Sequence, residues 1–405
     1  MRDTDLLQTA LGLPTPWVVS GNRFDAVARR LDIDITFAKG ARFTCPGCGA
    51  TDCPVHDTEA KSWRHLNFFQ HEAYLNARVP RIRCQSCGVR LVGVPWAREG
   101  SGFTLLFEAM VMPMLRATPV AEVARQVGEH DTRLWRVIHH YVDEARACDD
   151  HSGVTRAAFD ETAARRGHDY VTLFVDLDAP PRVLFVADGK DADTVRAFAT
   201  DLVAHGGDPA RIQDACMDMS PAFIAGTAAH LPQAEITFDR FHIVKILNEA
   251  VDAVRRDEQK NRPELKRSRY LWLKNDTSLS DSQRERRDSL AKSHLKTARA
   301  WQIRLTFQQF YQQPSREAAE VFLKRWYFWA THSRLPPVIE AARTIKRHWN
   351  GILRWHETKI ANGILEGINS LVQAAKAKAR GYRSSRNLKA MIYLIAGRLE
   401  LALPT

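Results

Sequence analysis

The sequence predicts an α/β domain with an all-α insertion, preceded by a small cysteine-rich β module and a pair of helices. From residue 152 onward, short apolar strands alternate with amphipathic helices, which is typical of an α/β fold. Two Cys-x-x-Cys-Gly units lie within residues 40–98, and a helix–glycine–helix pattern occupies residues 118–141. A chain of 405 residues is long enough for two or three such domains.

The overall charge indicates a polyanionic partner. The formal net charge is +11, for which nucleic acid is the simplest partner and a merely basic, well-solvated surface is the alternative. The N-terminus lacks the pattern of a signal peptide, and no apolar run approaches the roughly 20 residues that span a bilayer. We therefore expect a soluble, cytoplasmic protein.

The N-terminal part is expected to hold a helical segment, residues 1–39, followed by a zinc ribbon, residues 40–98. Each Cys-x-x-Cys pair precedes a glycine, and such a turn lets two thiolates converge on one tetrahedral ion. Four thiolates leave no open position, so the zinc is expected to be structural. Cys53 and His56 lie close by and can replace or supplement a ligand. The expected zinc ligands are Cys45, Cys48, Cys84 and Cys87.

Residues 103–148 are expected to form a helix-turn-helix domain. Pro119 suits the first position of a helix, and Gly128 allows a tight turn into a second helix. On that second helix Arg133 and Arg136 are expected to face outward, where a recognition helix meets DNA. The alternative is an ordinary α-hairpin.

Residues 152–405 are expected to form the α/β domain. Its elements follow the order strand, strand, strand, helix, strand, helix, strand, helix. The first three strands can pair as a meander, and the later crossovers require parallel neighbours. The expected strands are residues 154–160, 169–178, 181–188, 211–220 and 234–239.

Residues from about 255 to 358 are helical in pattern, charged and rich in tryptophan. We interpret them as an all-α insertion. Aromatic residues at helical spacing pack in cores more often than they stack on bases.

Three carboxylates are candidates for a metal site. Asp160 ends the first expected strand and Asp218 ends the fourth, so the two side chains meet if these strands are parallel neighbours. Two such carboxylates repel each other unless a divalent cation lies between them. A third carboxylate from a helix would complete a two-metal site that cleaves phosphodiesters.

Glu366 is suited to be that third carboxylate. It is the single acid in residues 362–390, in a helix that Asn362 can cap, and every later charge in that stretch is positive. Its expected neighbours on the polar face include Asn369 and Gln373. The alternative is that all three are ordinary surface acids. Other aspartates also end strands, namely Asp176, Asp178, Asp188 and Asp239.

Four blocks of the sequence resemble a known family. AFDETAARRGHDY, QDACMDMSPAF, FDRFHIVKILNEAVD and NGILEGINSLVQAAKAKARGYRSSRNLKAMIY are similar to successive blocks of bacterial insertion-sequence transposases of the ISL-three family. The resemblance spans residues 45–394. It implies an N-terminal zinc-binding segment, a helix-turn-helix, and a DDE catalytic domain of RNase H-like fold.

The resemblance also implies roles for individual residues. Asp160, Asp218 and Glu366 would be the catalytic triad that binds Mg²⁺ or Mn²⁺, with Asp239 and His242 as the auxiliary or rival groups. The basic segment after Glu366 would hold DNA phosphates. Its expected contacts are Lys376, Lys378, Arg380, Arg383 and Arg386.

The expected function is therefore that of a DNA transposase. It would bind the terminal inverted repeats of an insertion sequence and catalyse metal-dependent strand cleavage and strand transfer into target DNA. A homodimer or larger assembly on paired ends, associated with a bacterial nucleoid, is the natural expectation. The alternatives are a non-catalytic DNA-binding regulator and an RNase H-like nuclease or resolvase without strand transfer.

Overall fold

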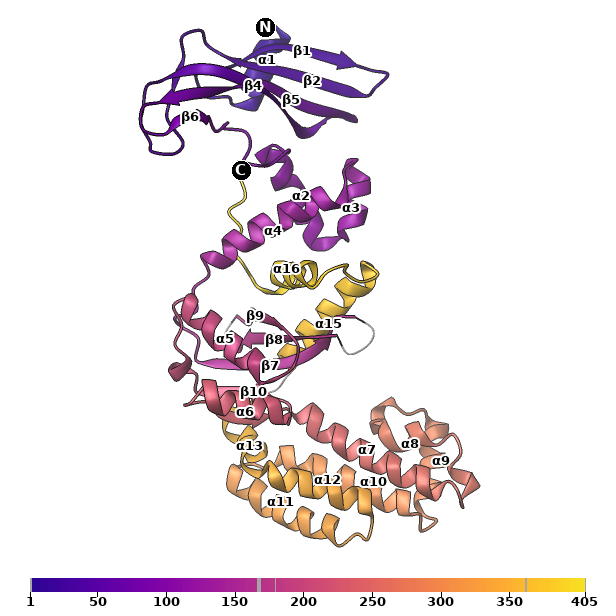
Figure 1. Ribbon diagram of the computed structural model, residues 1–405. Coiled ribbons are helices and arrows are strands. Elements are labelled where there is room, and N and C mark those ends of the chain that lie inside the picture. Colours follow the sequence, from indigo (N-terminus) through magenta and orange to yellow (C-terminus); the bar gives the residue numbers. More distant parts are fainter. Residues whose placement is uncertain (1, 166–168, 179, 361–362, 405) are drawn as a thin grey trace. The chain divides into compact units, whose positions relative to one another are not determined.

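The computed structural model describes residues 2–165, 169–178, 180–360 and 363–404 (Figure 1). The chain divides into two compact units, one of Met1–Ala145 with Glu400–Thr405 and the other of Arg146–Leu399. Each unit has a hydrophobic core of its own. Each is described separately below.

The first unit contains a six-stranded sheet in the order β1-β2-β5-β4-β3. β2 pairs with the first half of β5, and β6 pairs with its C-terminal end. β2 and β5 are parallel, and the other neighbours are antiparallel. The long β4–β5 hairpin is the centre of this sheet. The strands are β1 (Trp17–Asp25), β2 (Arg30–Phe37), β3 (Arg42–Phe43), β4 (Cys53–Phe68), β5 (His71–Cys84) and β6 (Gly88–Leu91).

The prediction of a helical segment over residues 1–39 is wrong. Only α1 (Asp3–Leu11) is helical, and β1 and β2 follow it. Leu31, Ile33 and Ile35 alternate along β2 and are buried, which is the period-two pattern of a strand with one face in the core. Because β2 pairs with β5, residues 17–37 belong to the same sheet as the strands of the zinc ribbon.

Three helices complete the first unit: α2 (Leu105–Ala117), α3 (Val120–Val127) and α4 (Asp131–Ala147). Gly128 ends α3 in the left-handed conformation, with φ of 72°, as a tight turn between two helices requires. The expected start of α3 is shifted by one residue, since Pro119 is the N-cap rather than the first helical residue.

The second unit is built on a five-stranded sheet in the order β11-β10-β7-β8-β9. β7, β8 and β9 form the expected antiparallel meander, β10 runs parallel to β7, and β11 runs parallel to β10. The prediction that the first strand ends at Asp160 is wrong, because pairing with β8 continues to Ala163. The strands are β7 (Arg156–Ala163), β8 (Tyr170–Asp176), β9 (Arg182–Asp188), β10 (Asp214–Met217) and β11 (Glu235–Phe238).

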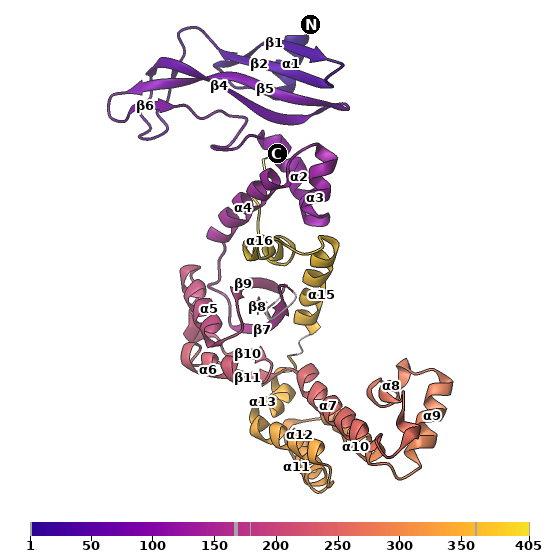
Figure 2. The same cartoon turned by 45° about the vertical axis from the view of Figure 1, so that its right-hand side comes forward.

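Helices cover both faces of this sheet (Figures 1 and 2). α5 (Ala192–Ala204), α6 (Pro221–His230) and α7 (Arg240–Glu258) pack on the face that contains Phe159 and Phe174. α15 (Gly363–Lys378) and α16 (Ser385–Ala396) pack on the opposite face. Asn362, expected to cap α15, lies outside the described residues.

The segment between α7 and α15 is helical, as expected for the insertion. Two of its tryptophans, Trp272 and Trp326, are buried in the core, whereas Trp329 is partly exposed. The helices are α8 (Arg269–Leu273), α9 (Asp281–Ala291), α10 (Lys296–Phe307), α11 (Arg316–Thr331), α12 (Pro336–Arg347), α13 (Trp349–Leu353) and α14 (Trp355–Thr358).

Within the described residues, no helix combines the length and the apolar composition needed to cross a membrane.

Candidate active site and zinc centre

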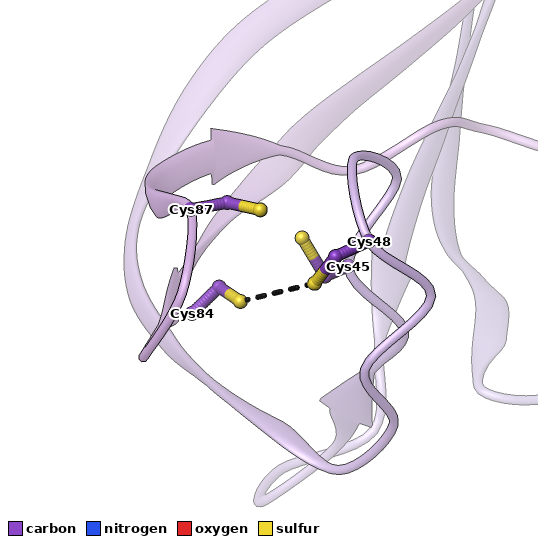
Figure 3. Close-up of side chains that lie close together, drawn as sticks. All are labelled: Cys45, Cys48, Cys84 and Cys87. Carbon is purple, nitrogen blue, oxygen red and sulfur yellow. Dashed lines mark hydrogen bonds between the residues drawn. The ribbon is translucent and has the colours of Figure 1, made fainter.

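Four cysteine side chains converge in the first unit (Figure 3). The sulfur atoms of Cys45, Cys48, Cys84 and Cys87 all lie within 4.8 Å of one another, and those of Cys48 and Cys84 are 3.5 Å apart. Four thiolates around a zinc ion have sulfur atoms about 3.8 Å apart, given Zn–S bonds of about 2.3 Å. The group therefore fits a tetrahedral, structural zinc ion.

Two turns bring the cysteine pairs together. Gly49 and Gly88 follow the two pairs with φ of 75° and 72°, a left-handed conformation that favours glycine. Backbone N–H groups of Cys87 and Ser86 donate hydrogen bonds to the Cys84 sulfur and, with the neighbouring thiols of Cys48 and Cys45, lower the pKa of the Cys84 thiol to about 6. A thiol that ionises near neutral pH is ready to bind a metal.

The two other candidate zinc ligands lie outside this group. Cys53 is buried, and its thiol contacts the backbone oxygen of Ala50 at 3.4 Å. His56 is exposed, and its Nδ1 lies 3.2 Å from the Arg83 guanidinium. The geometry thus favours four cysteines as the complete ligand set.

The two arginines that are expected to contact DNA have different surroundings in the structure. Arg136 is exposed on α4. Arg133 is engaged within its own unit: it pairs with Glu129, donates to the Gly102 oxygen at 3.1 Å, and lies 4.1 Å over the Phe103 ring. Arg133 therefore holds the helical domain together, and Arg136 has the freer guanidinium.

In the second unit, three aspartates fall on one row of the sheet. The β10–β7 register pairs Cys216 with Ala158, so two residues further on Asp218 is opposite Asp160. The β10–β11 register pairs Met217 with Phe238, so the next residue places Asp218 opposite Asp239. Neighbouring strands are about 4.8 Å apart, so the three aspartates are neighbours along this row. Their carboxylate oxygens do not all lie within 4.8 Å of one another.

The three aspartates also share a face of the sheet. Side chains alternate between the two faces along a strand. Ala158 and Cys216 belong to the core beneath α15 and α16, so Asp160 and Asp218, two residues later, point the same way. Phe238 belongs to the opposite core, so Asp239, one residue later, also lies on the α15 side.

The charges in this cluster act on one another. Burial raises the pKa of Asp160 to about 6, the charge of His242 opposes that rise, and the charges of Asp218 and Asp239 add to it. His242 Nδ1 lies 3.0 Å from Asp239, and this hydrogen bond raises the pKa of His242. Asp239, which is 4% exposed, also caps α7 through the Phe241 N–H.

α15 is attached to the strand that carries Asp160. Asn369 Nδ2 donates to Asp160 Oδ2 at 2.9 Å. Glu366 precedes Asn369 by three residues, so both side chains lie on the same side of the helix. Glu366 is exposed and makes no hydrogen bond or ion pair with any described residue. Its carboxylate therefore has no competing partner among the described residues.

The donor set of this cluster fits a hard divalent cation. Its members supply carboxylate oxygens, and Asn369 adds an amide oxygen, Oδ1, that is buried without a partner among the described residues. Mg²⁺ and Mn²⁺ prefer such oxygen ligands.

The basic residues after Glu366 differ in their surroundings. Lys376 is not free, since its Nζ donates to the Ala163 oxygen at 2.6 Å. Arg386 is exposed and also has an interaction within the chain. The remaining members of the expected set are exposed: Lys378, Arg380 and Arg383.

The apolar residues of α15 are only partly buried. Leu365 and Val372 are buried with Ile368 beside them, but Ile364 and Leu371 are 37% and 47% exposed. The sequence predicts Asn369 on the polar face of the helix and indicates no particular role for it. Its spacing of three residues from Glu366 was the available signal.

Comparisons with known proteins agree with this organisation. Residues 41–87 match the zinc finger of the transposases of IS204, IS1001, IS1096 and IS1165, and residues 93–142 match the helix-turn-helix domain of transposase family ISL3. Residues 158–392, more than half of the chain, match the DDE transposase domain of ISL3. The chain belongs to the ISL3 family of transposases. The resemblance seen in the sequence is confirmed, together with the zinc ribbon and the helix-turn-helix.

Two curated transposases are similar to this chain over most of its length. The transposase for insertion sequence element IS1001 of Bordetella parapertussis is 31% identical over 357 residues, 84% of this chain and 85% of that protein. The transposase for insertion sequence element IS1557 of Mycobacterium tuberculosis is 28% identical over 435 residues, 97% of this chain and 96% of that protein.

Proposed function

We propose that this ISL3-family protein binds the terminal inverted repeats of an insertion sequence and catalyses metal-dependent DNA strand cleavage and strand transfer. The observation that carries this proposal is the hydrogen bond between Asn369 and Asp160. It brings the helix of Glu366 against the strand of Asp160, beside the row that contains Asp218.

In this proposal Asp160, Asp218 and Glu366 hold the cations. Bound Mg²⁺ or Mn²⁺ would activate a water or a 3′-hydroxyl and stabilise the leaving oxygen of the phosphodiester. Asp239 fixes His242, whose raised pKa favours the imidazolium form and a positive charge near the scissile phosphate. The exposed Lys378, Arg380 and Arg383 supply phosphate contacts, which weaken as salt concentration rises.

The fold of the second unit supports the same proposal. Three antiparallel strands are followed by two parallel ones, with helices on both faces, and the acidic row runs from β7 across the carboxyl ends of β10 and β11. We assign this topology to the RNase H-like class. Joining two element ends in one assembly requires at least two sites, so we propose a dimer or larger complex on DNA.

The test is cleavage of labelled DNA that carries the element's terminal inverted repeats, with Mg²⁺ or with EDTA. We expect Mg²⁺-dependent nicking at the repeat ends by the wild type. Glu366→Gln should lower that rate at least about 1000-fold while binding to the repeats survives, because the change removes one metal-binding charge. The matched control is Glu285→Gln, an exposed acid on α9, which should cut normally.

Each alternative function predicts a different result. If neither the wild type nor Glu366→Gln cuts DNA that both bind, the protein is a regulator. If the wild type cuts but never joins the ends to target DNA, it is a nuclease or resolvase. Normal cutting by Glu366→Gln would remove Glu366 from the triad and make Asp239 the next candidate.

A further inference from the structure

Three polar side chains on one side of α15 bind consecutive parts of β7. We call them the α15 ladder. They are spaced four and three residues apart, so they line one helix face. The contacts are Asn369 Nδ2 to Asp160 Oδ2 at 2.9 Å, Gln373 Nε2 to Thr162 Oγ1 at 2.7 Å, and Lys376 Nζ to the Ala163 oxygen at 2.6 Å.

The first contact of the ladder differs from the other two in its acceptor. Gln373 and Lys376 bind a hydroxyl and a backbone oxygen, whereas Asn369 binds the carboxylate of Asp160. Asp160 Oδ1 accepts from the Glu161 N–H at 2.9 Å. Each oxygen of Asp160 therefore has one donor that fixes its orientation and keeps lone pairs for a further ligand.

The second amide atom of Asn369 indicates where that ligand lies. Asn369 Oδ1 is buried and has no hydrogen-bond partner among the residues that the structure describes. An unpaired buried acceptor is unfavourable, so native proteins rarely retain one without water, an ion or a functional role. Oδ1 and Nδ2 of Asn369 are bonded to the same carbon atom. Oδ1 is therefore near the Asp160 carboxylate that Nδ2 contacts.

We propose that Asn369 is a positioning residue for the metal site: Nδ2 orients Asp160, and Oδ1 accepts a hydrogen bond from a water in the hydration shell of the bound cation. This inference rests on the proposed function, because it requires a cation at Asp160. Mg²⁺ retains several of its waters when bound to proteins, and these waters donate hydrogen bonds. Groups that orient metal ligands contribute strongly to metal affinity.

Gln373 is a matched control for this role. It makes the same kind of helix-to-strand hydrogen bond one turn further along α15, to Thr162 and to the Ala163 oxygen. Neither acceptor is a candidate metal ligand. A ladder that only attaches α15 to β7 would respond alike to the loss of either amide.

The experiment measures Mn²⁺ binding to the full-length protein by electron paramagnetic resonance, without DNA. We expect Asn369→Ala and Asn369→Leu to weaken Mn²⁺ binding by roughly 10- to 100-fold, the range typical of residues that orient metal ligands. Gln373→Ala should change it less than about 2-fold, because it touches no candidate metal ligand. Thermal melting of each variant checks that the chain is folded, and Asn369→Leu preserves the side-chain volume.

The result that overturns the inference is equal Mn²⁺ affinity in folded Asn369→Leu, Gln373→Ala and wild-type protein. Equal weakening by both ladder variants also overturns it, because the effect would then be helix attachment. Asp160→Ala in the same assay separates this inference from the proposed function. If Asp160→Ala binds Mn²⁺ as well as the wild type, the metal site itself is misplaced. If only Asp160→Ala loses binding, the site stands and Asn369 has no part in it.

Discussion

Asp160 shows how a candidate metal ligand can lower the stability of the fold. Its carboxyl lies in the sheet beneath α15, and burial raises its pKa from 3.8 to about 6. Ionisation of this carboxyl therefore lowers the free energy of unfolding as pH rises from about 4 to about 6. At pH above about 6 the loss in the free energy of unfolding is on the order of 2–3 kcal/mol, since one pKa unit corresponds to about 1.4 kcal/mol.

We predict that Asp160→Asn stabilises the metal-free protein. In EDTA at pH 7.5 the free energy of unfolding should rise by about 2 kcal/mol, because the ionisation cost is removed. Asn369 can rotate its amide to accept from the new one. The gain should be smaller at pH 5, where the wild-type carboxyl is largely protonated in the folded state. Urea unfolding at the two pH values measures it.

The pKa of Asp188 is shifted in the opposite direction, so Asp188→Asn serves as the control. Burial acts to raise its pKa, but hydrogen bonds from Lys389 and Ser385 hold the pKa of Asp188 below its usual value. Its contribution is present at neutral pH and is lost as pH falls, so Asp188→Asn should destabilise the protein at pH 7.5. A gain for both variants at pH 7.5 would contradict this account.

Among the elements near the acidic row, two helical glycines differ in how closely other residues approach them. α13 lies against β11, and a Cβ on Gly351 would be 2.5 Å from the Phe238 ring and 2.9 Å from the Ile236 oxygen. Gly367 lies within α15, and a Cβ there would meet nothing within 4 Å. Gly351 therefore permits the close approach of α13 to β11, whereas the space beside Gly367 is open.

We predict opposite effects for alanine at these two positions. Gly351→Ala should lower the free energy of unfolding by about 1–3 kcal/mol through overpacking against β11. Gly367→Ala should raise it by about 0.5–1 kcal/mol, because alanine favours a helix interior. Chemical denaturation of both variants provides the measurement. Stabilisation by Gly351→Ala would show that α13 and β11 are not packed as described.

At the scale of the whole molecule, the two units have different sources of stability. The second unit has two apolar cores on the faces of its sheet. The first combines an apolar core with the four-cysteine group at the end of its central hairpin. Metal binding at such a group contributes directly to folding.

We predict that zinc removal affects the first unit alone. Wild-type protein should contain one zinc ion per chain, and Cys48→Ser should contain much less, because a thiolate ligand is lost. Hydrogen exchange in Cys48→Ser should increase over residues 41–91 and stay unchanged over residues 156–238. Cys148→Ser, at an exposed cysteine outside the group, is the control. An equal increase in hydrogen exchange in both units of Cys48→Ser would contradict a local role for zinc.

From the sequence, local patterns predict the order of elements in the second unit, the helix-turn-helix and the four cysteines that converge in the structure. These features follow local rules: period-two and helical patterns of apolar residues, a glycine between helices, and paired cysteines before glycine. A helix over residues 17–37 conflicts with the same rules, because buried Leu31, Ile33 and Ile35 alternate as in a strand. The end of β7 was misplaced because its pairing with β8, rather than its composition, continues it to Ala163.

Tertiary packing selects which distant residues come into contact. The register of β10 with β7 and β11 aligns Asp160, Asp218 and Asp239, and no local pattern encodes a register between strands that are distant in the chain. The contact of Asn369 with Asp160 joins residues 209 positions apart. Arg133 resembled a DNA contact until its partners within the fold were known. Such contacts depend on how complete elements pack, because packing selects partners by shape and burial rather than by position in the sequence.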